Sequence, residues 1–425
     1  MNIHFSQATE RFLLAAKQAE TEALRQLTAS CRVVAAISAL IHQLQRERGI
    51  SNIFLASGCE RFQAQRQHQI QICTDTEQQL RDLLSEHYLA VSQHHSRVLH
   101  RISFSLQGLD TLPWLRHQTA EMQLNVLEIT QAYCRLIASL LALVTEVAET
   151  SGEASITRLL VALFNLMQAK EYAGQERAWG AVGFAESQFD VSLCERLQQL
   201  QYAQQEHLKN THELVTAPCS IEISADMLHG SAQLQQMRAL IQRLVDGSPV
   251  AAQISEVWYE LATSRIDLLY QAEQQLTAQL LSLTQQRLAD TENMLKQHQR
   301  QLKSLAEQQP TGKPASLLFD PALPGLFGAT GQQDIPVMPT TDGMLNHTFY
   351  DLLQEQAAHI RQMNEQLQEA RQALYEQKQI DRAKLLLMQQ LGLSEQQAYR
   401  QLQQKAMSSQ QRLADVASQL MQQLT

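Results

Sequence analysis

The sequence predicts an all-α protein built from helical bundles. Its 425 residues include only 15 glycines and 9 prolines, and they are rich in Leu, Gln, Ala and Glu, which favours helix throughout the chain. Apolar residues recur three and four positions apart over long stretches, as they do on the buried face of an amphipathic helix. A chain of this length exceeds one hydrophobic core, so we expect two or three domains.

Segments with this periodicity give the expected helices in chain order. Residues 5–56, 60–107 and 115–149 each predict a long helix, and Ser151-Gly152 interrupts the pattern before a fourth helix near Ile156. Long helices joined by short turns pack most simply as antiparallel four-helix bundles, and we expect a pair of them. The helices of the second bundle are expected at residues 186–208, 223–246 and 250–308. The last of these segments is either one very long helix or two helices.

A segment rich in proline and glycine, residues 309–344, divides the chain. Six of the nine prolines lie between Pro310 and Pro339, and no other stretch interrupts helix so persistently. We therefore expect a linker that joins a large N-terminal part, residues 1–308, to a small C-terminal part, residues 345–425.

The C-terminal part begins with a predicted coiled coil. Ile360, Met363, Leu367, Ala370 and Leu374 alternate three and four positions apart. This spacing forms a seam of about two heptads, as in a short coiled coil. We expect the protein to form a homodimer through this seam.

Charge and cysteine usage restrict the class of protein. The net charge of −9 argues against a protein that coats nucleic acid over its whole surface. The six cysteines form no C-x-x-C pair and no metal-type pairing with histidine, so we expect no metal site. The N-terminus lacks the apolar core of a signal peptide, and the most apolar runs, residues 33–41 and 136–144, are about half as long as a bilayer span. We expect a soluble, cytoplasmic protein with no membrane contact.

Three stretches near the C-terminus predict a compact helical unit. Residues 380–388 (IDRAKLLLM) form a basic helix, Gly392 stops it, and Ser394 caps the next helix with Gln397 three residues later. A third helix is expected from about Ser409. The apolar stripe of the last two helices comprises Ala398, Leu402, Ala406, Met407, Leu413, Val416, Ala417 and Leu420.

The order and spacing of these stretches resemble the ANTAR domain, an RNA-binding module of transcription antiterminators, over about residues 350–424. The resemblance implies a dimer that binds paired hairpins of a leader mRNA and prevents a terminator from forming. Residues 378–412 carry six basic and two acidic side chains, a local positive patch on a negative chain. Charge alone favours a solvated helix face over an RNA-binding one, and the motif reverses that preference.

Two positions depart from the ANTAR pattern, because Leu385 replaces a usual glycine and Gln403 replaces a usual arginine. The lost arginine removes one expected phosphate contact. Tyr399 either stacks on an RNA base or packs in the three-helix core. The candidate RNA contacts are Lys384, Arg382, Arg400, Lys405, Arg412 and Tyr399.

The N-terminal part contains no phosphate loop, nucleophile elbow, metalloprotease motif or dinucleotide fingerprint, so we expect a binding protein and not an enzyme. One pattern occurs twice there, in residues 44–49 (LQRERG) and 174–180 (GQERAWG). In both, Glu-Arg is followed by small residues that let another helix approach, so Arg48 and Arg177 are expected to pack between helices. Arg265 lies in a third element, residues 258–267.

These three elements resemble the NIT domain, an all-helical nitrate- and nitrite-sensing module, over about residues 35–285. NIT followed by ANTAR resembles a nitrate-responsive antiterminator of the NasR type. The resemblance implies nitrate or nitrite as the ligand, with no cofactor. The guanidinium fork matches the planar nitrate ion, and two facing arginines repel each other until an anion bridges them. We predict Arg48 and Arg265 as the leading pair, with Arg177 as a third ligand or helper.

Two alternatives stay open at this stage. Arg48 and Arg177 could instead pair with Glu47, Glu176 or other carboxylates, because structural ion pairs are common. Arg238 and Arg46 are weaker candidates for the anion site. The whole chain could also be a helical scaffold and dimerisation protein without a small-molecule ligand. The main hypothesis is that anion binding releases the ANTAR module to bind leader RNA.

Overall fold

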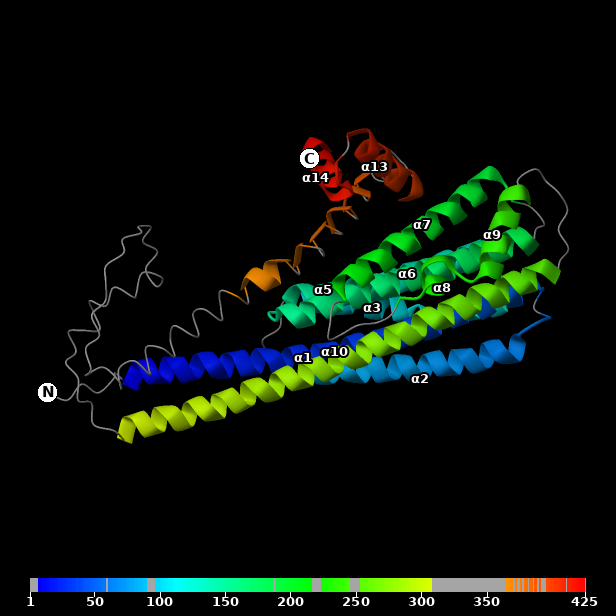
Figure 1. Cartoon of the computed structure of the whole chain (residues 1–425). Coiled ribbons are helices and arrows are strands. Elements are labelled where there is room, and N and C mark those ends of the chain that lie inside the picture. Colours follow the sequence, from blue (N-terminus) through cyan, green and yellow to red (C-terminus); the bar gives the residue numbers. More distant parts are fainter. Residues whose placement is uncertain are drawn as a thin grey trace. The chain divides into compact units, whose positions relative to one another are not determined.

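The computed structural model contains α-helices and, within its described residues, no strand, which confirms the all-α fold (Figure 1). The linker at 309–344 lies outside the described residues, as do Gly392, Ser394 and most of the predicted coiled-coil seam. The described residues are 7–58, 60–89, 96–185, 189–215, 223–244, 253–307 and 362–424, the last range without 363, 370, 373–374, 377, 381, 385, 388–389, 391–394 and 410.

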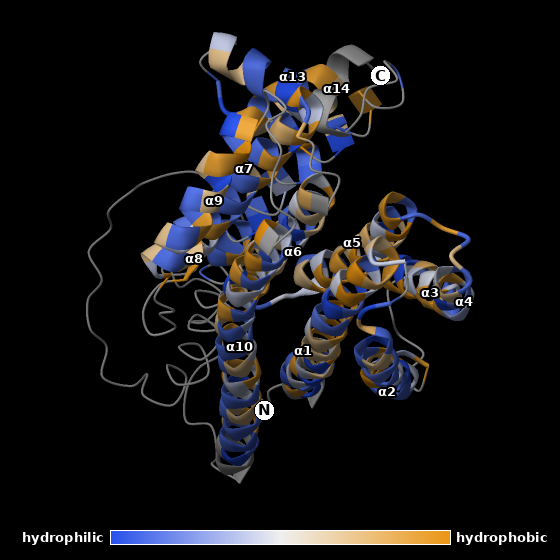
Figure 2. Ribbon diagram, turned by 90° about the vertical axis from the view of Figure 1, so that its right-hand side faces the viewer, coloured by the Kyte–Doolittle hydropathy of each residue, from blue (hydrophilic) through white to orange (hydrophobic). Residues whose placement is uncertain are grey.

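The first bundle is built from the first five helices. Helix α1 is antiparallel to α5, because Glu47, Arg48 and Asn52 contact Tyr133, Cys134 and Thr130 in turn. Figure 2 shows hydrophobic residues concentrated on α5, whereas α2 is mostly hydrophilic. The bundle comprises α1 (Gln7–Ala56), α2 (Gln63–Tyr88), α3 (Ser96–Asp110), α4 (Leu112–Ala120) and α5 (Val126–Thr150).

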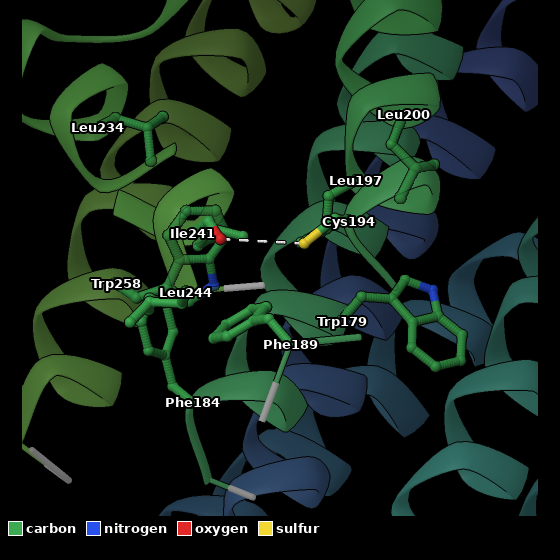
Figure 3. Close-up of a cluster of buried hydrophobic side chains, with 10 residues drawn as sticks. All are labelled: Trp179, Phe184, Phe189, Cys194, Leu197, Leu200, Leu234, Ile241, Leu244 and Trp258. Carbon is green, nitrogen blue, oxygen red and sulfur yellow. Dashed lines mark hydrogen bonds between the residues drawn. The ribbon is translucent and has the colours of Figure 1, made fainter. Parts of the chain in front are cut away.

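The second bundle is built from α6 (Ala154–Ala185), α7 (Val191–Leu214), α8 (Ala225–His229), α9 (Ala232–Arg243) and α10 (Gln253–Glu307). Figure 3 shows the aromatic core shared by α6, α7, α9 and α10. In it, the ring centroids of Phe184 and Trp258 lie 5.8 Å apart, and those of Phe184 and Phe189 lie 4.8 Å apart. Helix α10 is continuous over 55 residues, which settles the choice between one helix and two.

Three expected helices are divided in the structure. The predicted helix 60–107 becomes α2 and α3, at a place with neither glycine nor proline to mark the break. The predicted helix 115–149 becomes α4 and α5, because Asn125 and Glu128 form a capping box that starts α5. The predicted helix 223–246 becomes α8 and α9, separated by Gly230 with φ 83°. The break at Ser151-Gly152 is confirmed.

Helix α1 contacts both α6 and α10 in the larger of two compact units. Ser38 and His42 contact Glu273 and Tyr270, so α1 and α10 are antiparallel there. The larger unit contains residues 26–285 together with the C-terminal helices. In the smaller unit, which holds the start of α1 and the end of α10, Arg25 Nη2 donates to Glu292 Oε1 at 2.7 Å.

Two stretches, Leu14–Ala56 and Val126–Thr150, are long and apolar enough to cross a membrane by length and composition, although the apolar runs predicted from the sequence are shorter. Core helices of soluble proteins satisfy the same criterion. The buried residues of the two stretches in this chain include Ile37, Ile41, Ile137 and Val144, which have no exposed surface. Within the described residues, these two helices supply much of the first bundle's core.

The C-terminal helices α13 (Glu395–Ser409) and α14 (Leu413–Leu424) pack on helical residues that precede them. Their core contains seven of the eight predicted stripe residues, and Ala383 and Leu387 join it. Met407 is the exception, because its side chain is 80% exposed. It follows Ala406 by one position, which rotates it about 100° away from the buried stripe.

Candidate anion-binding site

A layer of buried charged side chains lies where α1, α6 and α10 meet. Arg48 comes from α1, Lys170, Glu171 and Arg177 come from α6, and Glu273 comes from α10. None of the five is more than 2% exposed. Buried charges are costly unless they are paired, so the partners of each group decide what the layer does. We call these five residues the charged layer.

Arg48 is held by a carboxylate of the neighbouring helix. It donates from Nη1 to Glu171 Oε1 at 2.5 Å and from Nη2 to Glu171 Oε2 at 3.2 Å, and Nη1 also meets Cys134 Sγ at 3.0 Å. Gln45 and Gln175 donate further hydrogen bonds to the same carboxylate. Burial alone would lower the pKa of Arg48, but Glu171 raises it above its ordinary value.

Glycines let the two arginines pack against the facing helix backbone. A Cβ atom added at Gly174 of α6 would lie 2.5 Å from Arg48 Nη2. One added at Gly49 of α1 would lie 2.6 Å from Arg177 Nη2 and 2.7 Å from the hydroxyl of Tyr259. The expectation that small neighbours allow Arg48 and Arg177 to be buried between helices is confirmed.

Arg177 differs from Arg48 in having no ion pair among the residues that the structure describes. Its Nη1 donates to Thr263 Oγ1 at 2.9 Å, its Nη2 donates to the Gln45 carbonyl at 3.0 Å, and its guanidinium lies 4.8 Å from the centroid of the Tyr259 ring. Burial lowers the pKa of Arg177, and the positive charge of Arg48 lowers it further. It nevertheless keeps its charge at neutral pH, because an arginine begins with a pKa above 12.

The third cation of the layer is fully compensated. Lys170 Nζ lies 2.5 Å from Glu273 Oε2, and Ser38 donates to the other oxygen of that carboxylate. Lys170 also faces the ring of Tyr270, on which His42 stacks with ring centroids 3.6 Å apart. Three buried cations thus face two buried carboxylates, which leaves one positive charge in the charged layer.

Arg265 lies in a different cluster, and no described contact joins it to Arg48. It donates to Gln204 and to the carbonyl of Met227, and its Nη1 lies 3.8 Å from Glu176 Oε2. Burial lowers the pKa of Arg265 to about 10, and the charge of Arg238 adds to this effect. The structure therefore brings Arg48 together with Arg177 and not with Arg265. Glu176 and Arg177 both contact α10, but Glu176 otherwise faces α7 and α9, whereas Arg177 faces α1.

The carboxylates considered as alternative partners have arginines of their own. Glu47 pairs with Arg116 at 2.8 Å, and Glu176 accepts two hydrogen bonds from Arg238, both at 2.7 Å. The partner of Arg48 is instead Glu171, which sequence reasoning missed. A signal for it exists, because Lys170-Glu171 directly follows the strongly apolar start of α6.

Glu171 and Cys134 also line a cavity of about 860 Å³, whose walls include residues of α5, α6, α7 and the C-terminal helices. Arg48 is not among the lining residues, although it contacts Glu171 and Cys134, which are. Other polar groups on its walls are Arg135, Gln168 and Asn210. A small ion in this cavity would meet the Arg48–Glu171 pair from the carboxylate side.

Comparison with known proteins gives this buried charge its context. The family described as nitrate and nitrite sensing matches residues 39–281, which is more than half of the chain and includes the whole charged layer. The chain belongs to the nitrate and nitrite sensing family. The ANTAR domain family matches residues 368–421.

Two known proteins match nearly the full length of this chain. A nitrate regulatory protein of Klebsiella oxytoca is 28% identical over 413 residues, which cover 96% of this chain and 93% of that protein. The solved structure of the NasR transcription antiterminator has 26% sequence identity to this chain and a TM-score of 0.60. The match covers 97% of this chain and 98% of the chain in that structure.

The predicted RNA contacts of the ANTAR domain differ in exposure. Arg382 and Lys405 are exposed. Arg400 is also exposed, but it donates to Glu195 of α7 at 2.9 Å, and Arg412 donates to Glu376. Lys384 lies 5.8 Å from the centroid of the Tyr399 ring. Tyr399 is half-buried, and burial raises its pKa, which favours its packing role over base stacking.

Proposed function

We propose that this protein is a nitrate-responsive transcription antiterminator that binds nitrate or nitrite in the charged layer, between Arg48 and Arg177. The single observation that carries the site is the guanidinium of Arg177, which is 2% exposed and forms no direct ion pair with a carboxylate among the described residues. It lies beside a second buried arginine. A buried cation without a counterion is costly, and a bound monoanion would relieve that cost.

The chemistry of the layer fits a flat monoanion. Each guanidinium presents parallel N–H donors in one plane, and nitrate has three oxygens in one plane. Arg177 donates to the neutral oxygens of Thr263 and Gln45, which an anion outcompetes as an acceptor. Arg265, which follows Thr263 by two residues, is then a helper that holds α10 through Glu176 and Gln204.

The anion would act by shifting the balance between two helix arrangements. Arg48 comes from α1 and Arg177 from α6, and Arg177 also donates to Thr263 of α10. A ligand that bridges the arginines therefore changes the forces between these helices. Arg400 and Lys378 pair with Glu195 of α7 and Glu149 of α5, which supports a restrained ANTAR domain in the anion-free protein. Release would free its basic side chains for RNA.

The remaining parts of the proposal follow from the domain pair. The sensor comprises residues 1–308 and the RNA-binding part residues 345–425, joined by a linker at 309–344. The partners are leader mRNA with paired hairpins and a second copy of this chain, and the location is the cytoplasm. Anion sensing and RNA binding need neither a metal nor a catalytic group. No cluster of three or more His, Cys, Asp or Glu side chains that could hold a metal occurs among the described residues.

Isothermal titration with nitrate tests the sensor. The full-length wild type is expected to bind, whereas Arg48→Ala and Arg177→Ala are expected to lose at least tenfold in affinity. Arg32→Ala is the matched control, because Arg32 is an exposed arginine of α1 and should leave the affinity unchanged. Equal binding by Arg177→Ala and Arg32→Ala would rule out this site.

A gel-shift titration tests the output. Full-length protein and a leader RNA with two adjacent hairpins are mixed with and without nitrate at fixed ionic strength. Nitrate is expected to tighten binding, and the affinity should fall steeply with salt because the contacts are to phosphates. If no RNA binds at low salt under either condition, the scaffold alternative is the better description.

A further inference from the structure

We infer that Glu171 is a built-in competitor of the anion, which occupies the Arg48 fork in the empty sensor and sets the concentration at which the sensor responds. This inference rests on the proposed function and names the residue that tunes its site. A carboxylate and nitrate present the same feature to a guanidinium, namely two oxygens in a plane that share negative charge.

The geometry makes Glu171 a stand-in ligand. Both of its oxygens meet the two terminal nitrogens of Arg48, at 2.5 and 3.2 Å. This two-point contact is the one that a planar anion would make with the same fork. While Glu171 holds it, Arg48 contributes no net charge to the layer, and only Arg177 attracts an anion. Exchange of one negative group for another would let both arginines serve the ligand.

The surroundings of Glu171 provide a place for the displaced carboxylate. Glu171 lines the cavity of about 860 Å³, and Arg48 is not among its lining residues. A rotation of the Glu171 side chain away from Arg48 would therefore move its charge into an open space that Arg135 also lines, and not into the packed core. Gln175, on the same helix one turn later, also lines the cavity and donates to Glu171 Oε1 at 3.0 Å. It helps to hold the carboxylate in place.

Glu171→Gln tests this inference, because it removes the competing charge but keeps the shape and an oxygen for Arg48. In full-length protein, the variant is expected to bind nitrate at least tenfold more tightly than the wild type. Glu47→Gln is the matched control, since Glu47 is an equally buried α1 carboxylate that pairs with Arg116. Its effect on nitrate affinity should be less than about threefold, because it lies outside the charged layer.

A second variant keeps the test valid if Glu171→Gln does not fold. Gln175→Ala removes one hydrogen bond to the carboxylate at a half-buried position. Loss of one such bond is worth about 1 kcal/mol, so nitrate affinity is expected to rise about fivefold. If Glu171→Gln binds nitrate no more tightly than the wild type does, the inference is overturned. Where Glu171→Gln is unfolded, the same result for Gln175→Ala overturns it. In both cases nitrate binding by the wild type still supports the proposed function. Absence of nitrate binding by the wild type overturns both.

Discussion

At the scale of single residues, the site depends as much on two glycines as on the arginines. Gly49 and Gly174 let each arginine reach the backbone of the facing helix, so the cations are shielded from water without a bulky neighbour. Helix propensity alone would favour alanine at both positions by up to about 1 kcal/mol. Their presence in helix interiors therefore reflects the space that the guanidinium groups need.

Gly174→Ala is predicted to impair nitrate binding. The new Cβ would lie 2.5 Å from Arg48 Nη2, so the guanidinium must move away from Glu171. We expect a net loss of about 1–3 kcal/mol in the free energy of unfolding, because overpacking exceeds the gain in helix propensity. Urea unfolding and nitrate titration measure the two effects. Gly152→Ala, where the Cβ meets nothing within 4 Å, should change neither.

Glu176→Gln is predicted to alter stability on the acid side. Burial alone would raise the pKa of Glu176, but Arg238 and Arg265 lower it overall. A lowered folded-state pKa contributes stability that is complete above the ordinary pKa of about 4.3 and is lost as pH falls through the folded value. The free energy of unfolding of the variant should be lower than that of the wild type by about 3 kcal/mol at pH 7. This difference in stability should shrink below about pH 4, where Glu176 of the wild type becomes protonated.

Urea unfolding at a series of pH values measures this difference. Glu121→Gln, which changes an exposed glutamate, serves as the control and should follow the wild type at every pH. A difference between Glu176→Gln and the wild type that stays constant from pH 7 to pH 3 would contradict the prediction.

At the scale of elements, α6 organises the sensor because two adjacent residues belong to different arginine clusters. Glu176 contacts α7, α9 and Arg265 of α10, and Arg177 contacts α1 and Thr263 of α10. The close approach of α10 depends on Gly180, where an added Cβ would lie 2.3 Å from Cε2 of Trp258. The indole of Trp258 also donates to the Arg177 carbonyl at 3.1 Å. The spacing of α6 and α10 is thus linked to the position of Arg177.

Gly180→Ala is predicted to separate α6 from α10. The rigid indole of Trp258 cannot move aside for the new methyl group as a flexible side chain could. We therefore expect the free energy of unfolding to fall by about 3 kcal/mol, at the upper end for overpacking. The double variant Gly180→Ala/Trp258→Phe should recover part of the loss relative to the sum of the single changes, because the smaller ring leaves room for the methyl group. Strict additivity in a double-mutant cycle by urea unfolding would argue against this contact.

At the scale of the whole molecule, the long helices α1 and α10 enter both compact units, whereas the charged layer lies in the larger one alone. Ligand binding to the folded protein must therefore appear as added stability of that unit. At a nitrate concentration 100 times the Kd, mass action adds about 2.7 kcal/mol.

Nitrate is predicted to raise the Tm of the wild type by several degrees, because about 1 kcal/mol shifts the Tm of a large domain by about 2–4 °C. Arg177→Ala should show at most about half of this rise, because an affinity at least tenfold weaker leaves no more than about 1.4 kcal/mol of added stability. Thermal unfolding followed by circular dichroism measures both, with sodium chloride at the same ionic strength as the control. An equal rise with chloride would indicate a general salt effect and not a site for the planar anion.

The fold was predictable from local patterns, and its internal breaks were not. Helical periodicity and the scarcity of glycine and proline identify the long helices and the break at Ser151-Gly152. The division near residue 90 has no glycine or proline, and the turn before α5 places Met122 at φ 54°, a conformation rare outside glycine. The start of α5 does carry a local signal, the Asn125–Glu128 capping box, but the helical periodicity on both sides of it outweighed that signal in the prediction.

The sequence by itself determined the all-α class, the order of the two family domains and the burial of Arg48 and Arg177 among small residues, because these depend on residue type and spacing along one helix. Only the tertiary structure decided which groups meet: Arg48 with Glu171 and Arg177 in one cluster, Arg265 with Glu176 and Arg238 in another. Adjacent residues of a helix point about 100° apart, so their partners depend on which helices pack on each face. Those packing choices involve residues far apart in the sequence, 123 positions for Arg48 and Glu171 and 62 for Glu176 and Arg238.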